Sequence, residues 1–66
     1  MAVRQHLINR RIELELTQQQ VADAAGITRS SYATIERGLR NPSLEVAQKI
    51  SKKLKMKTEK SFPLKG

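Results

Sequence analysis

The side chains best suited to recognition chemistry lie in one short segment that runs from Arg29 to Arg37. Ser30, Ala33 and Thr34 recur there at the spacing that places them on one face of a helix. An arginine guanidinium can donate two hydrogen bonds to the O6 and N7 atoms of guanine, and hydroxyl and methyl groups can contact neighbouring bases. We therefore predict base contacts by Arg29, Ser30, Ala33 and Thr34.

This interpretation has plainer alternatives. Arg29 would equally suit a solvated surface or a contact to phosphate alone, and phosphate contacts carry no sequence information. Small residues on the same face, Ala33 above all, could serve only to avoid a clash with DNA. The type of residue alone does not choose between these roles.

Catalytic and metal-binding arrangements are not visible in the sequence. His6 is the single histidine, and the chain has no cysteine, so neither a thiolate zinc site nor a disulfide is expected. The serines and threonines have no neighbouring histidine or lysine in a nucleophile motif, and we interpret them as helix caps. We predict no enzyme activity, no metal and no cofactor.

Size and charge set the class of the protein. Sixty-six residues allow one domain with a small core, and 13 Lys and Arg against 6 Asp and Glu give a net charge of +7. Such a charge favours a polyanion, although ribosomal proteins and membrane-surface helices share it. The first residues lack the apolar core of a signal peptide and no apolar run is long enough to span a membrane, so we expect a cytoplasmic protein.

The elements that carry these residues are expected to be helices. Apolar spacing predicts a first helix over about Val3–Leu14. A second begins at Thr17, because the hydroxyl of Thr17 and the side chain of Gln20 match a capping box, and it ends at Gly26. Its narrow apolar face consists of Val21, Ala22 and Ala25.

Two further helices follow the same logic. Thr28 is expected to cap a third helix that stops at Gly38 and buries Tyr32 and Ile35. Ser43 is expected to cap a fourth helix. The apolar residues that repeat along it are Leu44, Ala47, Ile50 and Leu54.

The end of the chain is less regular. Thr58 is expected to cap one last turn through Ser61, and Pro63 forbids a longer helix. Phe62 and Leu64 are apolar, and they are expected to pack either on the domain or on a second subunit.

The chain resembles the Cro and phage-repressor family of helix-turn-helix regulators, also called the XRE family. The resemblance covers Leu16–Gly38 and continues through the fourth helix, with the motifs Leu-Thr-Gln, Ala-x-x-x-Gly, Ile-Glu-x-Gly and Pro-Ser-Leu in order. It implies an all-α fold, a compact bundle of four to five short helices containing a helix-turn-helix, as in lambda-repressor-like DNA-binding domains. We expect this domain over residues 1–57, with a short tail over 58–66 that takes part in the dimer interface.

The resemblance also implies a function. Family members bind operators as homodimers, so we expect a sequence-specific regulator of transcription, acting as a repressor on a palindromic site in double-stranded DNA. Paired recognition helices would enter successive major grooves. Members of the family also serve as antitoxins or as restriction-modification controllers, and both alternatives stay open.

Further residue roles follow from the resemblance. Gln18 begins the second helix, where its amide and the free backbone N–H groups suit a phosphate. Arg11 and Glu36 are implied to form a salt bridge between the first and third helices, which would offset an unfavourable carboxylate at a helix C-terminus. The loop after the third helix follows the DNA backbone in the family, which implies phosphate contacts by Arg37, Arg40 and Asn41.

The chain departs from the family pattern at three positions. Glu15 and Lys55 stand where family members usually have glycine, and positive φ is costly for residues with a side chain. We therefore expect these two helix ends to be built differently. Tyr32 replaces the usual Ile or Val, so its hydroxyl needs water or a partner if the ring is buried. The tail also lacks a recognisable fifth helix.

Overall fold

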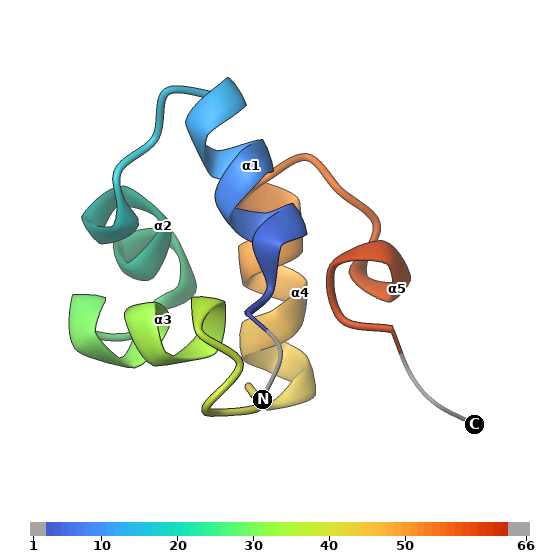
Figure 1. Cartoon of the computed structure of the whole chain (residues 1–66). Helices are drawn as coiled ribbons and strands as arrows, with labels where there is room; N and C mark the ends of the chain where they lie inside the picture. Colours follow the sequence, from blue (N-terminus) through green and yellow to red (C-terminus); the bar gives the residue numbers. More distant parts are fainter. Residues whose placement is uncertain (1–2, 64–66) are drawn as a thin grey trace.

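The computed structural model describes residues 3–63, and all the regular structure within them is helical (Figure 1). The expected all-α fold with a helix-turn-helix is confirmed. The five helices are α1 (Gln5–Glu13), α2 (Gln18–Ala25), α3 (Arg29–Glu36), α4 (Leu44–Lys53) and α5 (Thr58–Ser61).

Three helices begin at the predicted caps. The Thr17 hydroxyl accepts a hydrogen bond from the Gln20 N–H at 3.1 Å, and the Gln20 side chain accepts one from the Thr17 N–H at 2.8 Å. Thr28 accepts from the backbone N–H of Ser31, and Ser43 from that of Val46. These bonds satisfy N–H groups that have no partner within the helix, and they fix where α2, α3 and α4 start.

Several boundaries differ from the predicted ones. The first helix starts only at Gln5, because Arg4 has a non-helical backbone and donates its N–H to the carbonyl of Glu36 at 2.7 Å. The third ends at Glu36, two residues before Gly38. Thr58 is the first residue of α5 and not its cap, a position held by Lys57 without a side-chain hydrogen bond.

The core lies where the first four helices meet. Leu7 of α1, Val21 of α2, Tyr32 of α3 and Ile50 of α4 are fully buried, as is Leu54 directly after α4. Helix α2 packs against both α3 and α4, while α1 crosses in front of α4 (Figure 1). The small side chains of Ala22 and Ala25 in α2 are buried and allow this close approach.

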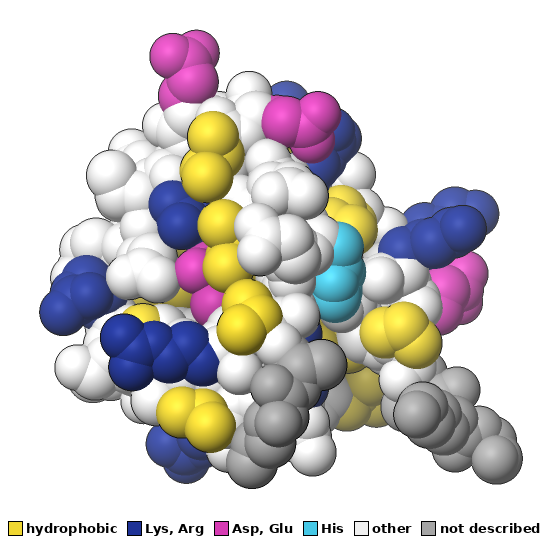
Figure 2. All heavy atoms as spheres, viewed as in Figure 1, with side chains coloured by type: hydrophobic (Ala, Val, Ile, Leu, Met, Phe, Trp, Pro, Cys, Tyr) yellow, Lys and Arg dark blue, Asp and Glu magenta, His cyan; other side chains and the backbone are white. Residues whose placement is uncertain are grey.

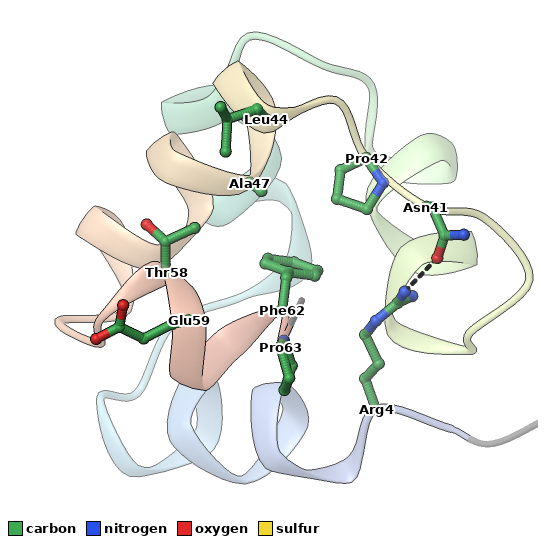
Figure 3. A pocket seen from close by; sticks show the side chains of 9 residues that line it. All are labelled: Arg4, Asn41, Pro42, Leu44, Ala47, Thr58, Glu59, Phe62 and Pro63. Carbon is green, nitrogen blue, oxygen red and sulfur yellow. Dashed lines mark hydrogen bonds between the residues drawn. The ribbon is translucent and has the colours of Figure 1, made fainter. Parts of the chain in front are cut away.

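Leu44 was expected in the apolar repeat of α4, and this expectation is wrong. Leu44 is 64% exposed, whereas Ala47 and Ile50 are buried. Leu44 lines an open groove and does not belong to the core. The groove has a volume of about 730 Å³ and is lined by Arg4, Asn41, Pro42, Leu44, Ala47, Thr58, Glu59, Phe62 and Pro63 (Figure 3).

The expectation about the two helix ends that lack glycine is also wrong. Glu15 has φ 57° and Lys55 has φ 56°, so both keep the left-handed conformation. Each helix closes with the same pair of bonds: Glu15 and Leu16 donate to carbonyls of α1, and Lys55 and Met56 do so after α4. Leu16 and Met56 then pack against the core, which holds the residue before each of them in place.

Replacing either of these residues by glycine is expected to stabilise the fold. Glu15→Gly and Lys55→Gly each relieve a strain of about 1–2 kcal/mol and lose part of that gain to unfolded-chain entropy. We expect a net gain of about 0.5–1 kcal/mol each, or a few degrees in thermal melting followed by circular dichroism. Gly26→Ala is the matched opposite, because Gly26 has φ 72° with open space around it. A lower melting temperature for both glycine variants would contradict this account.

The end of the described chain packs back on the domain. His6 lies on α1, and its Nε2 atom is 2.6 Å from the carbonyl oxygen of Ser61 in α5. Ser61 is buried and Phe62 is partly buried against the core. Leu64, which was expected to pack nearby, lies outside the described residues. Within residues 3–63, no helix is long and apolar enough to cross a membrane.

Candidate nucleic-acid interface

The turn between α2 and α3 presents α3 to the outside. Gly26 adopts the left-handed conformation that ends α2, and the Ile27 N–H donates to the carbonyl of Ala22 at 3.0 Å. Tyr32 and Ile35 hold the inner face of α3 against the core. The other face of α3 is left available to a partner.

The four predicted base-contacting residues share this outer face. Arg29 and Ser30 are exposed at the first turn of α3, and Ala33 and Thr34 are half-buried one turn later. The Thr34 hydroxyl donates to the carbonyl of Ser31 at 2.7 Å, which leaves its lone pairs and its methyl group for other contacts. The face thus presents the long hydrogen-bond donor of Arg29 and the short side chains of Ser30, Ala33 and Thr34. These groups can contact base edges in a major groove.

A chain of hydrogen bonds joins this face to the interior. Arg29 donates from Nη1 to the Gln18 side-chain oxygen at 3.2 Å, and the Gln18 amide nitrogen donates to Oε1 of Glu36 at 3.0 Å. Gln18, expected to hold a phosphate, therefore has its amide engaged at both ends. One amide hydrogen of Gln18 and the backbone N–H groups of Gln18 and Gln19 remain for an anion, since the Gln20 N–H already donates to Thr17.

Glu36 is held by a buried ion pair with Arg11. The Arg11 Nε donates to Oε2 of Glu36 at 2.7 Å, and the two side chains are 15% and 3% exposed. Arg11 also donates to the carbonyl of Leu16 at 3.0 Å. Burial raises the pKa of Glu36, but hydrogen bonds from Arg11 and Gln18 outweigh it, so the pKa lies below its ordinary value of 4.5.

The lowered pKa of Glu36 makes stability depend on acid. Its stabilisation is fully present above about pH 5.5 and is lost as the pH falls through the folded-state pKa, below 4.5. We therefore expect the difference in unfolding free energy between the wild type and Glu36→Gln to shrink as the pH falls from 7 to 3. Urea unfolding across that range measures it. A difference that does not change with pH would rule out this coupling.

Tyr32 lies beside the same carboxylate. Its ring is fully buried, and its hydroxyl has no hydrogen-bond partner among residues 3–63. Burial, and after it the nearby Glu36, raise the pKa of Tyr32, so the phenol stays neutral. The partner that a buried tyrosine hydroxyl needs is thus not present in the described part of the chain.

The loop between α3 and α4 carries the remaining predicted residues. Arg37, Arg40 and Asn41 are all exposed. Figure 2 shows Lys and Arg side chains gathered on the side of the molecule that carries α2 and α3, with acidic atoms between them. Positively charged side chains therefore lie around α3. They are placed to attract the phosphates on either side of a DNA groove.

Arg4 was not singled out by the sequence, yet it holds this loop. Its guanidinium donates to the carbonyls of Ile35 at 2.7 Å and Arg40 at 3.0 Å, and to the Asn41 side-chain oxygen at 2.6 Å (Figure 3). It also lies 5.3 Å from the centroid of the Phe62 ring. All four partners are far away in sequence, so no local pattern could have indicated them.

No metal site is formed by the described residues: His6 and the acidic side chains within 3–63 make no group of three or more potential ligands.

Comparison with known families identifies α2, the turn after it and α3 as part of a helix-turn-helix domain. Residues 7–60 match the helix-turn-helix family model. The chain is 46% identical over 52 residues to YqaF of Bacillus subtilis strain 168, a protein described as an HTH-type transcriptional regulator, and the match covers 79% of this chain and 68% of that one. It is also 36% identical to the cryptic phage CTXphi transcriptional repressor RstR of Vibrio cholerae, over 64% of this chain and 38% of the repressor.

Solved structures give the same result. The restriction-modification controller protein C.AhdI from Aeromonas hydrophila superposes with a TM-score of 0.80 at 32% identity, covering 89% of each chain. A chain of the SinR–SinI protein complex superposes with a TM-score of 0.80 at 27% identity, covering 92% of this chain and 60% of that one. The chain belongs to the XRE-type helix-turn-helix family of DNA-binding transcriptional regulators.

Proposed function

We propose that this chain is a transcriptional repressor that binds a palindromic operator as a homodimer, with α3 of each copy in the major groove. One observation carries the proposal: the exposed donors of α3 stand beside the N-terminus of α2 and the basic α3–α4 loop. A helix that reads bases needs backbone-binding groups on both flanks, because phosphate contacts set its register and orientation.

Each predicted residue has a place in this proposal. Arg29 reads a guanine, and the short side chains of α3 contact the adjacent bases. Gln18 and the first turn of α2 hold the phosphate on one side of the groove, where the helix dipole favours an anion. The bases are contacted by Arg29, Ser30, Ala33 and Thr34, and the phosphates by Gln18, Arg37, Arg40 and Asn41.

Repression follows from occupancy of the operator. The similarity to the phage repressor RstR supports this sign of regulation. The cytoplasm is the compartment that fits binding to a bacterial or phage operator.

Dimerisation is supported by the surface around α5. A domain of this size buries a limited core, and association commonly supplements it. Leu44 is 64% exposed and lies in the same groove as Phe62 and Pro63 (Figure 3). We propose residues 1–57 as the DNA-binding part and 58–66 as the part that contributes to the dimer contact.

A restriction-modification controller is the second candidate. The superposition with C.AhdI supports it, because 89% of both chains takes part. The two candidates share fold, DNA contacts and symmetry, and they differ in the genes that the operator governs. Selected sites upstream of restriction and modification genes would favour the controller.

Selection from a random duplex DNA pool tests the proposal. The wild-type chain is expected to enrich a two-fold symmetric motif whose half-sites lie about one helical turn apart. Sedimentation of the complex with that duplex should give two chains per duplex. Absence of an enriched motif, or one chain per duplex, would contradict it.

A further inference from the structure

We infer that Arg4 is a positioning residue for DNA binding, which fixes the side-chain amide of Asn41 so that its nitrogen faces a phosphate. This inference rests on the proposed function, because it takes Asn41 as a phosphate contact. It assigns a role to the segment before α1, which neither the family motifs nor the sequence pattern connect to the DNA-binding surface.

The geometry around Arg4 defines one orientation of the Asn41 amide. The Arg4 Nη2 donates to Oδ1 of Asn41 at 2.6 Å. A guanidinium has donors and no acceptor, so it must face the oxygen of the amide and not its nitrogen. The NH₂ group is thereby turned away from Arg4, and among residues 3–63 no group accepts a hydrogen bond from it.

The same guanidinium holds the backbone on both sides of the loop. Its Nη1 donates to the carbonyl of Ile35 in α3 and to that of Arg40 directly before Asn41. The Arg4 N–H also donates to the carbonyl of Glu36. The planar fork therefore ties the C-terminal end of α3 to the loop in a way that a flexible ammonium would not reproduce.

Phe62 supports Arg4 from the other side. The guanidinium carbon lies 5.3 Å from the ring centroid, within the range of a cation–π contact, and Phe62 is half-buried against the core. The N-terminal segment, the α3–α4 loop and the residue after α5 thus meet at one side chain (Figure 3). A phosphate at Asn41 meets an amide whose orientation is already set, which lowers the ordering cost of the contact.

A double-mutant cycle on the wild-type-selected duplex tests the inference. We expect Arg4→Ala and Asn41→Ala each to weaken binding about tenfold, the typical scale for a hydrogen bond to a charged group. The double variant should also bind about tenfold more weakly, because both changes remove one contact. An affinity about a hundredfold below that of the wild type for the double variant would overturn the inference. So would an unchanged affinity for Arg4→Ala.

A second variant, Arg4→Lys, distinguishes the positioning of Asn41 by the guanidinium from the effect of the positive charge alone. It also keeps the inference testable if Arg4→Ala folds poorly. Arg4→Lys keeps the charge and loses the fork, so it should bind as weakly as Asn41→Ala. Wild-type affinity of Arg4→Lys would overturn the inference.

A measurement without DNA keeps this test apart from that of the proposed function. In the free protein, the nitrogen and proton shifts of the Asn41 side-chain amide should move to solvent-like values in Arg4→Lys. Unchanged shifts would overturn the assigned orientation even if the wild type selects an operator. A wild type that selects no operator, with the shifts moving as expected, would instead contradict the proposed function and the role in DNA binding together.

Discussion

Arg11→Met is expected to destabilise the fold by about 3–5 kcal/mol at pH 7, the scale for removing one partner of a buried ion pair. The Glu36 side chain is 3% exposed, so without Arg11 its charge would be buried with the Gln18 amide as its remaining donor. A small domain has few kcal/mol of stability in total, so the variant should be largely unfolded at 25 °C. Circular dichroism with urea titration measures the loss.

Two comparisons separate this effect from a general loss of packing. Adding Glu36→Gln to Arg11→Met should restore most of the lost stability, because no buried charge is then left unpaired. Lys49→Met is the matched surface control: its bond to Glu45 joins side chains that are 49% and 79% exposed, and its loss should cost less than about 0.5 kcal/mol. Similar losses for Arg11→Met and Lys49→Met would contradict a structural role for Arg11.

Arg29→Ala is expected to weaken binding to the selected operator about 5- to 150-fold, the range of about 1–3 kcal/mol for one bidentate base contact. It should also relax the preference for one base pair in each half-site. In the free protein, the hydrogen bond to Gln18 holds the side chain of Arg29 beside the N-terminus of α2. Competition binding with single-base-pair variants of the operator measures both effects.

Arg37→Ala is the matched control for Arg29→Ala. Both residues are exposed arginines near the ends of α3, but Arg37 is assigned to a phosphate. Its loss should weaken all sequences alike and reduce the slope of log affinity against log salt by about 0.9. If Arg29→Ala gave the same uniform loss, Arg29 would hold phosphate and would not read a base.

Local patterns account for what the sequence predicted well. Thr17, Thr28 and Ser43 each accept from an N–H group three residues away, so their types alone indicated where α2, α3 and α4 begin. The buried positions of α2 and α3 followed from helical spacing. The family resemblance added the outer face of α3, whose contacts to DNA remain predictions.

Tertiary contacts account for what could not be predicted. Glu15 and Lys55 keep positive φ because Leu16 and Met56 pack on the core, a requirement that residue propensity does not reveal. The exposure of Leu44, at the start of α4, depends on which side chains of other helices reach that turn, and helical spacing does not give this.

Arg4 shows the same limit within the candidate site. Its bonds span 31 to 37 residues. The spacing of residues within one helix does not indicate contacts between residues so far apart in the sequence.

We propose that α3 enters the major groove and that its outer face contacts the bases. Intermolecular NOEs between the labelled chain and its selected duplex test this most directly. We expect NOEs from the methyl groups of Ala33 and Thr34 to thymine methyls or cytosine H5 protons, which lie in the major groove. NOEs confined to sugar protons or adenine H2 protons, or contacts centred on helices other than α2 and α3, would contradict it.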